Sequence, residues 1–202
     1  MARRKAGIGE ELPEVNFSDY NGVRCLHLGT EWVQGSMKLD DPYEIELEYV
    51  QRMMAWLLFV EPTQVATRHA MQLGLGAGSL TKFIWRHLPQ TRVTVVEINP
   101  QVPMAARQFF KLPDEDERLK IRIADGADFV IRDKRHYDLI LVDGFDHNAR
   151  AGVLDTLPFY QAFWTRLSER GLMAVNLFSG QRGFKGRQDA IREAFDGRLC
   201  ML

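Results

Sequence analysis

Residues 69–78, His-Ala-Met-Gln-Leu-Gly-Leu-Gly-Ala-Gly, decide the fold that we predict for this chain. An apolar run leads into three alternating glycines, and apolar residues recur at helical spacing from Ser79 onward, so the glycines fall on a strand-to-helix turn. These glycines are Gly74, Gly76 and Gly78. A second apolar run, residues 93–96, ends at Glu97, which places an acidic side chain at the carboxyl end of the neighbouring strand.

In a parallel sheet these two strand ends meet at the crevice where open α/β folds bind their ligands. Glycines let a ligand approach the backbone closely, and the carboxylate of Glu97 can accept two hydrogen bonds from a ribose diol. A Gly-x-Gly-x-Gly pattern alone is weak evidence. Together with the preceding strand, the following helix and the acid, it predicts a nucleoside-binding site.

Composition excludes several classes of protein. The 202 residues suit one domain with a small appendage, and the net charge of −1, with both signs interspersed, gives no sign of nucleic-acid binding. We expect a cytoplasmic protein without a membrane segment, because the sequence shows neither a bilayer-spanning apolar run nor a signal peptide. Cys25 and Cys200 are expected to be reduced core thiols, and the cysteines and histidines show no metal-ligand spacing.

The first quarter predicts a small unit, residues 1–62, ahead of the main fold. Residues 1–20 are polar and suggest a loose arm, whereas residues 23–28 and 32–39 predict two strands of a hairpin. A helix is expected to start at Asp40-Asp-Pro42 and to end at Glu61-Pro62. Its expected buried stripe consists of Val50, Met53, Met54, Leu57 and Leu58.

The second unit, residues 63–202, alternates strands with helices, which implies a parallel sheet. Residues 119–123 alternate as an edge strand does, and residues 137–142 form an apolar run apart from Asp138, as in the middle of a sheet. Helices are expected after Pro100, over 156–168 and around Ala190. Further strands are expected at residues 171–177 and 198–202. We therefore predict a Rossmann-like α/β fold.

Acidic residues follow three of these strands in succession. They are Glu97, then Asp125 beside Gly126, and then Asp143 and Asp146. Asp125 also suits the N-cap of a helix that starts nearby, which does not exclude contact with a ligand. A polar turn is the alternative for the last two. Two carboxylates three residues apart repel one another, however, unless something cationic binds between them.

The motifs resemble those of the spermidine synthase (polyamine aminopropyltransferase) family. They are the glycine turn, Val96-Glu-Ile-Asn99, Ala124-Asp-Gly126 and the run from Tyr137 to Asp143-x-x-Asp146. The resemblance covers roughly residues 22–180, and it implies the S-adenosylmethionine-dependent class I methyltransferase fold with a small N-terminal domain. It also implies a transferase, no metal and a homodimer.

By this resemblance each site residue acquires a role. Glu97 would hold the ribose of decarboxylated S-adenosylmethionine or methylthioadenosine, and Asp125 with Gly126 would hold the adenine. Gln34 corresponds to a nucleoside-contacting glutamine and Tyr49 to a tyrosine of the amine pocket. Asp143 would accept a proton from the attacking amine. The remaining carboxylate, Asp146, would bind the far amine of a small-molecule diamine.

The sequence also departs from the family. Ala77 stands where the family has an acid that contacts the donor's ammonium, and Gly144 and Phe145 stand where serine or threonine is usual. Asn176-Leu-Phe178 replaces acidic residues after the fifth strand. Losing the acid at position 77 also removes repulsion against the carboxylate of unmodified S-adenosylmethionine. A methyltransferase of unknown acceptor is therefore the second hypothesis, and a non-catalytic nucleoside-binding protein is the third.

Two further features stay open. His147 suits a catalytic base or an ordinary loop histidine, and Arg150 suits either an anionic acceptor or plain exposure. The family's fold adds an antiparallel strand beside the sixth, and we expect that the sequence ending at Leu202 is incomplete.

Overall fold

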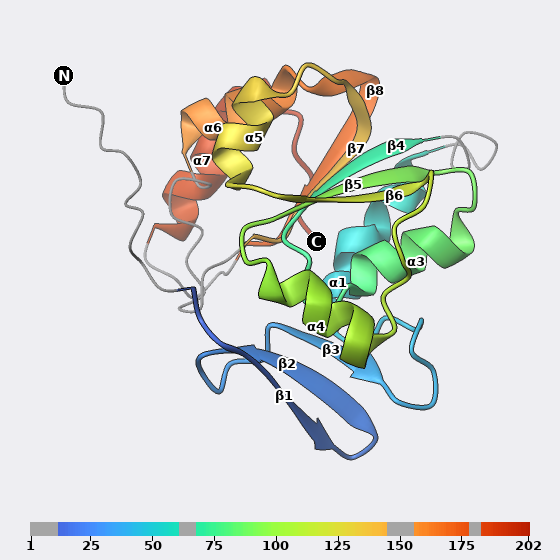
Figure 1. Cartoon of the computed structure of the whole chain (residues 1–202). Helices are drawn as coiled ribbons and strands as arrows, with labels where there is room; N and C mark the ends of the chain where they lie inside the picture. Colours follow the sequence, from blue (N-terminus) through green and yellow to red (C-terminus); the bar gives the residue numbers. More distant parts are fainter. Residues whose placement is uncertain (1–11, 61–67, 145–155, 178–182) are drawn as a thin grey trace.

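Two β-sheets organise the described part of the chain, which in this computed structural model comprises residues 12–60, 68–144, 156–177 and 183–202. The smaller sheet is antiparallel, with the strand order β1-β2-β3. The larger sheet has five parallel strands in the order β6-β5-β4-β7-β8. Figure 1 shows the smaller sheet, in blue, below the helices that cover one face of the larger sheet.

The smaller sheet contains one strand more than the sequence analysis predicted. Its strands are β1 (Val15–Tyr20), β2 (Val23–Leu28) and β3 (Gly35–Lys38). The expectation of a loose arm over residues 1–20 is therefore wrong for 15–20. Asn21 and Gly22, with φ of 49° and 78°, form the two-residue turn between β1 and β2. Asn-Gly is a strong hairpin signal, but β1 is exposed along most of its length and lacks the apolar pattern of a core strand.

The helical segment after the small sheet begins later than expected. It consists of α1 (Glu48–Met53), which continues directly into the 3-10 helix η1 (Met54–Phe59). Val50, Met53 and Met54 are buried as predicted, but Leu58 is 82% exposed and Trp56 is buried in its place. The tighter winding of a 3-10 helix moves the buried face away from the α-helical stripe.

The larger sheet confirms the predicted α/β fold and its alternating strands and helices. Its elements are β4 (His69–Leu73), α3 (Ser79–His87), β5 (Arg92–Glu97), α4 (Gln101–Phe110), β6 (Leu119–Ile123), α5 (Gly126–Arg132), β7 (Tyr137–Val142), α6 (Leu157–Trp164), β8 (Leu167–Val175) and α7 (Phe184–Ala194). The edge position of β6 and the inner position of β7 are also confirmed. The chain order reverses at β4, and such reversal points are where open α/β sheets bind ligands.

Helices cover both faces of this sheet. Figure 1 shows α1, α3 and α4 on one face and α5, α6 and α7 on the other. Each face has its own cluster of buried apolar side chains. Residues of α1 and η1 belong to the first cluster, so they share a core with the larger sheet. The division of the chain at residue 62 remains a prediction.

The sixth strand, expected over residues 198–202, is absent from the structure, so this prediction is wrong. Those residues have no sheet partner, and among the described residues β8 pairs with β7 alone. Cys200 is exposed and Cys25 is half-buried, which contradicts the expectation of core thiols. A groove of about 930 Å³ runs along β8. Residues of β8, η1, α7 and the segment after α7 line it.

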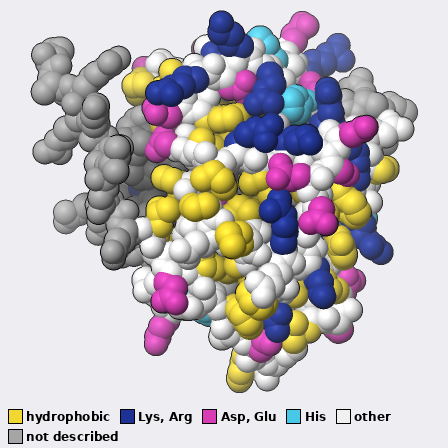
Figure 2. Space-filling view, in the orientation of Figure 1, with side chains coloured by type: hydrophobic (Ala, Val, Ile, Leu, Met, Phe, Trp, Pro, Cys, Tyr) yellow, Lys and Arg dark blue, Asp and Glu magenta, His cyan; other side chains and the backbone are white. Residues whose placement is uncertain are grey.

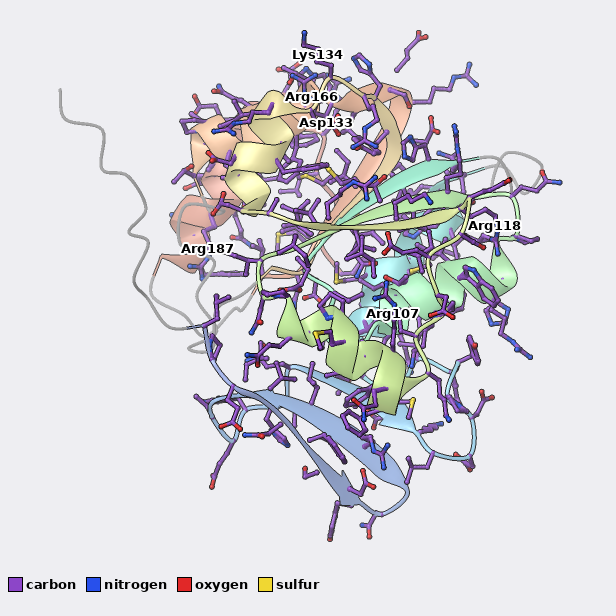
Figure 3. The ribbon with its side chains drawn as sticks, viewed as in Figure 1. Arg107, Arg118, Asp133, Lys134, Arg166 and Arg187 are labelled. Carbon is purple, nitrogen blue, oxygen red and sulfur yellow. The ribbon has the colours of Figure 1, made fainter. Side chains whose placement is uncertain are left out.

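Basic side chains donate hydrogen bonds to the carbonyl groups at the ends of two helices. Arg118, labelled in Figure 3, donates to the carbonyl oxygens of Trp85 and Leu88 at the end of α3, at 3.1 and 3.5 Å. Lys82 donates to the carbonyl oxygen of Phe110 at the end of α4, at 2.9 Å. Cations are favoured at helix carboxyl ends because the last carbonyl groups carry partial negative charge.

Lys82 makes the stability of the fold depend on pH. It is 1% exposed, and burial lowers its pKa from 10.5 to about 8. Above pH 8 the folded state releases this proton while the unfolded chain keeps it, so stability rises with pH until the unfolded lysine also titrates. Between pH 8 and 10 this contribution is about 2 kcal/mol.

We predict that Lys82→Met removes this rise in the free energy of unfolding. Denaturant titrations of both proteins at pH 8, 9 and 10 would measure it. The window stops at pH 10 because burial raises the pKa of Tyr137, which makes stability fall above that point. Equal slopes for the wild type and the variant across this range would contradict the assignment.

Candidate active site

The glycine turn after β4 lies against backbone from two other elements. Gly74 has φ of 81°, and a Cβ atom there would lie 2.3 Å from the carbonyl oxygen of Asp143. Gly76 has φ of 53°, and its Cβ would lie 2.8 Å from the carbonyl oxygen of Gln34. Glycine was predicted here because a ligand must approach closely. The structure shows that contacts within the protein already require it at both positions.

Gly78 is the N-cap of α3, so the turn also starts the helix that was predicted to follow it. Helix N-termini carry unpaired backbone N–H groups and partial positive charge.

Glu97 ends β5 and links that strand to the glycine turn. Its carboxylate accepts hydrogen bonds from the backbone N–H of Leu75 through Oε2 and of Asn99 through Oε1, both at 2.9 Å. Burial raises the pKa of Glu97, while these hydrogen bonds oppose the rise. Each carboxylate oxygen has a second lone pair, so the group can also accept from a ribose hydroxyl.

Asp143 follows β7 and is held between two other elements. Asn176, just after β8, donates from Nδ2 to Oδ1 of Asp143 at 3.0 Å. The hydroxyl of Tyr49 in α1 donates to Oδ2 at 3.4 Å. Burial raises the pKa values of both Asp143 and Tyr49. The structure therefore brings together Tyr49 and Asp143, which stand 94 positions apart in sequence.

Asp125 occupies the predicted end of β6 and also caps a helix. Its Oδ1 accepts from the backbone N–H of Asp128 at 2.9 Å, which makes it the N-cap of α5, and Gly126 is the first residue of that helix. The backbone N–H of Ala124 donates to the carbonyl oxygen of Glu97 at 3.0 Å. Asp125 therefore caps a helix, as the alternative interpretation of this residue predicted. The residue before it, Ala124, is hydrogen-bonded to Glu97.

We predict that Asp125→Ala lowers the free energy of unfolding by about 1 kcal/mol, the usual effect of losing an N-cap. Asp125→Asn should stay within a few tenths of a kcal/mol of the wild type, because asparagine caps as well as aspartate. Thermal or chemical denaturation of the three proteins tests this. Equal losses in both variants would show that charge, rather than capping, is responsible.

Ala77 has a structural explanation. It is 2% exposed and belongs to an apolar cluster with Leu26, Met37 and Phe110. A Cβ atom on Gly35 of β3 would lie 2.8 Å from the Cβ of Ala77, so the small sheet packs directly on the turn. An acid at position 77 would be buried among these apolar groups. Packing therefore accounts for alanine here.

Asp146, Phe145, His147 and Arg150 lie outside the described residues. Asn176, for which the sequence predicted no role, follows β8 at the same edge of the sheet as Asp143. Ile98 and Ile123 were not predicted to belong to the site, and they are 56% and 52% exposed. Ile98 directly follows Glu97, and Ile123 is paired with Glu97 across β5 and β6. Figure 2 shows apolar side chains gathered on the face over α4 and the neighbouring strands.

Within the described residues there is no group of three or more His, Cys, Asp or Glu side chains that could hold a metal ion, and no helix is long and apolar enough to cross a membrane. The site combines the glycine turn after β4, the buried carboxylate of Glu97 and the carboxylate of Asp143, whose backbone lies against Gly74. The fold and these groups define the class: a Rossmann-like α/β protein with a glycine turn and two acids at the carboxyl edge of its parallel sheet.

Comparison with known proteins gives the family. The spermine/spermidine synthase domain matches residues 48–177. A polyamine aminopropyltransferase of Neisseria meningitidis serogroup A is 41% identical over 200 residues, which is 99% of this chain and 75% of the relative. The chain belongs to the spermine/spermidine synthase family, and is a spermidine synthase-like transferase of polyamine biosynthesis.

Two other similarities are more distant. A probable spermidine synthase from Corynebacterium glutamicum shares the fold, with a TM-score of 0.75 and 23% identity over 93% of this chain and 69% of that one. The bovine eEF1A lysine and N-terminal methyltransferase is 31% identical over 152 residues, which is 68% of this chain and 22% of that protein. Both similarities agree with the predicted fold.

Proposed function

We propose that this protein transfers an aminopropyl group from decarboxylated S-adenosylmethionine to a small amine. This proposal rests on the close contact between Gly74 and the backbone of Asp143. It places an acid able to accept a proton directly against the turn that would hold the donor. Membership of the family and the likeness to aminopropyltransferases supply the reaction class.

The donor would lie at the carboxyl ends of β4, β5 and β6. Glu97 would accept hydrogen bonds from the ribose, and Asp125 with Gly126 would contact the adenine. Gln34, which reaches the turn from the small sheet, would close over the nucleoside. The exposed apolar side chains at positions 98 and 123 offer surface on which a purine can pack.

In the proposed reaction the amine nitrogen attacks the propyl carbon bonded to the sulfonium. The carbon–sulfur bond breaks, its electron pair goes to sulfur, and methylthioadenosine leaves. A free amine has a pKa of about 10, so it must lose a proton before or during attack. Asp143 would take that proton, and burial favours its protonated form because it raises the pKa of the carboxyl.

The acceptor pocket would combine Asp143, Tyr49 and Asp146. Tyr49 already contacts Asp143, and Asp146 would bind a second amine if the acceptor is a diamine. The family resemblance also favours a homodimer. The small sheet and its β2–β3 connection offer exposed aromatic side chains for such contacts, with Tyr20 and Trp32 exposed by 76% and 69%. Light scattering of the purified protein tests the dimer.

Calorimetric titration tests the donor. We expect decarboxylated S-adenosylmethionine and methylthioadenosine to bind more tightly than unmodified S-adenosylmethionine. Tighter binding of the unmodified compound would favour a methyltransferase, the function of the bovine relative. Binding of all three without product formation would favour a non-catalytic protein.

A further inference from the structure

The side chain of Asn176 lies against the carboxylate that we propose as the acid–base group. Its Nδ2 lies 3.0 Å from Oδ1 of Asp143, while Tyr49 approaches the other oxygen, Oδ2, at 3.4 Å. The backbone of Asn176 is fixed as well, because its N–H donates to the carbonyl oxygen of Val142 at 3.0 Å. This hydrogen bond joins the ends of the paired strands β7 and β8. It therefore fixes the backbone that carries the side-chain amide of Asn176.

The surroundings of Asp143 make this amide important. In the described parts of the chain, Asp143 is contacted by Tyr49 from α1, by Asn176 just after β8 and by the backbone of Gly74 after β4. None of these groups carries a formal charge at neutral pH. The ionised carboxylate therefore depends on two neutral hydrogen-bond donors, of which the amide is the shorter contact.

We propose that Asn176 is the positioning residue of Asp143. It holds Oδ1 toward β8 and leaves Oδ2, shared with the weaker donor Tyr49, to receive the proton of the acceptor amine. This inference rests on the proposed function. It adds a residue just after β8 that sets both the orientation of Asp143 and the pH at which Asp143 ionises.

Three substitutions at this position test the proposal. Asn176→Ala removes the donor, and kcat should fall about tenfold, because a hydrogen bond to a charged group contributes about one factor of ten. Asn176→Asp places a second carboxylate beside Oδ1, so that the pair shares a proton and the acidic limb of the pH profile of kcat moves up by at least about one unit. Asn176→Gln keeps the amide and should restore part of the activity.

Ser168→Ala is the matched control. Ser168 lies at the other end of β8 and donates to Oδ1 of Asp138 at 2.7 Å, so the variant also removes a side-chain hydrogen bond from β8 to an aspartate of β7. It should lower stability without moving the pH profile. Donor affinity, measured by calorimetry, should be unchanged in all four variants.

A direct titration of the Asp143 carboxyl by carbon-13 NMR separates this inference from the proposed function. We expect the pKa of Asp143 to be higher in Asn176→Ala and higher still in Asn176→Asp. Unchanged pKa values in both would overturn the positioning role, even if the enzyme is active. Failure of the wild type to form methylthioadenosine from any amine would instead overturn the proposed function, while the NMR result would still decide the role of Asn176.

Discussion

Asp143→Asn is expected to lower kcat by about 10² to 10⁴-fold, the usual contribution of a positioned general base. The amide cannot accept the proton that the amine must lose, although it has nearly the same shape. Its single amide oxygen can accept from Tyr49 while its NH2 group donates to the oxygen of a flipped Asn176 amide, so the pocket should stay assembled. Steady-state formation of methylthioadenosine measures kcat, and calorimetry should show unchanged affinity for the donor.

Asp138→Asn is the control for this substitution. Asp138 lies in the same strand, β7, where it accepts from the backbone N–H of His69 at 3.0 Å and from the hydroxyl of Ser168. The same chemical change there should affect stability and leave kcat near that of the wild type. Near-normal turnover by Asp143→Asn would remove Asp143 from the proposed mechanism.

Gly74→Ala is expected to reduce the free energy of unfolding by about 3 kcal/mol or more. Its positive φ costs a non-glycine residue about 1–2 kcal/mol, and overpacking in a tight site adds about 1–3 kcal/mol. The new Cβ would lie 2.3 Å from the carbonyl oxygen of Asp143, so either the turn or the end of β7 must move. Activity per folded molecule should therefore fall as well.

Gly22→Ala separates the effect of the positive φ on stability from the effect of overpacking. Gly22 has almost the same φ, 78°, but a Cβ there meets no atom within 4 Å. We expect a loss of only about 1–2 kcal/mol and unchanged turnover. Denaturation curves of the two variants give the comparison. Equal losses would mean that the contact between Gly74 and Asp143 is unimportant for stability.

The large sheet was predictable because its strands and helices carry distinct periods. The alternating β6 and β7, which is apolar apart from Asp138, each fit one position in a parallel sheet, and the structure confirms those positions. The other elements depended on weaker signals. β1 is mostly exposed, with only Val15 and Phe17 packed on apolar groups, and the 3-10 winding of η1 changes which side chain faces the core.

The terminal segment shows a different limit. Residues 198–202 have a strand-like composition, but a strand also needs a partner for its backbone groups. The composition of a segment does not show whether a neighbouring strand is present to pair with it.

The site was predictable at the strand ends, because parallel strands bring their carboxyl ends together. Gly74, Glu97 and Asp143 could be placed in this way, and the resemblance placed Tyr49. The contact of Asn176 with Asp143 could not be foreseen, since it depends on the register between β7 and β8. The reason for Ala77 was hidden as well, because it lies in the packing of the small sheet on the glycine turn.

The most direct test of the account is product analysis. The purified protein would be incubated with decarboxylated S-adenosylmethionine and a linear diamine, and the products identified by mass spectrometry. The account predicts equal amounts of methylthioadenosine and of the diamine carrying one added aminopropyl group, both strongly reduced in Asp143→Asn. Absence of both products, with methyl transfer from unmodified S-adenosylmethionine under the same conditions, would contradict it.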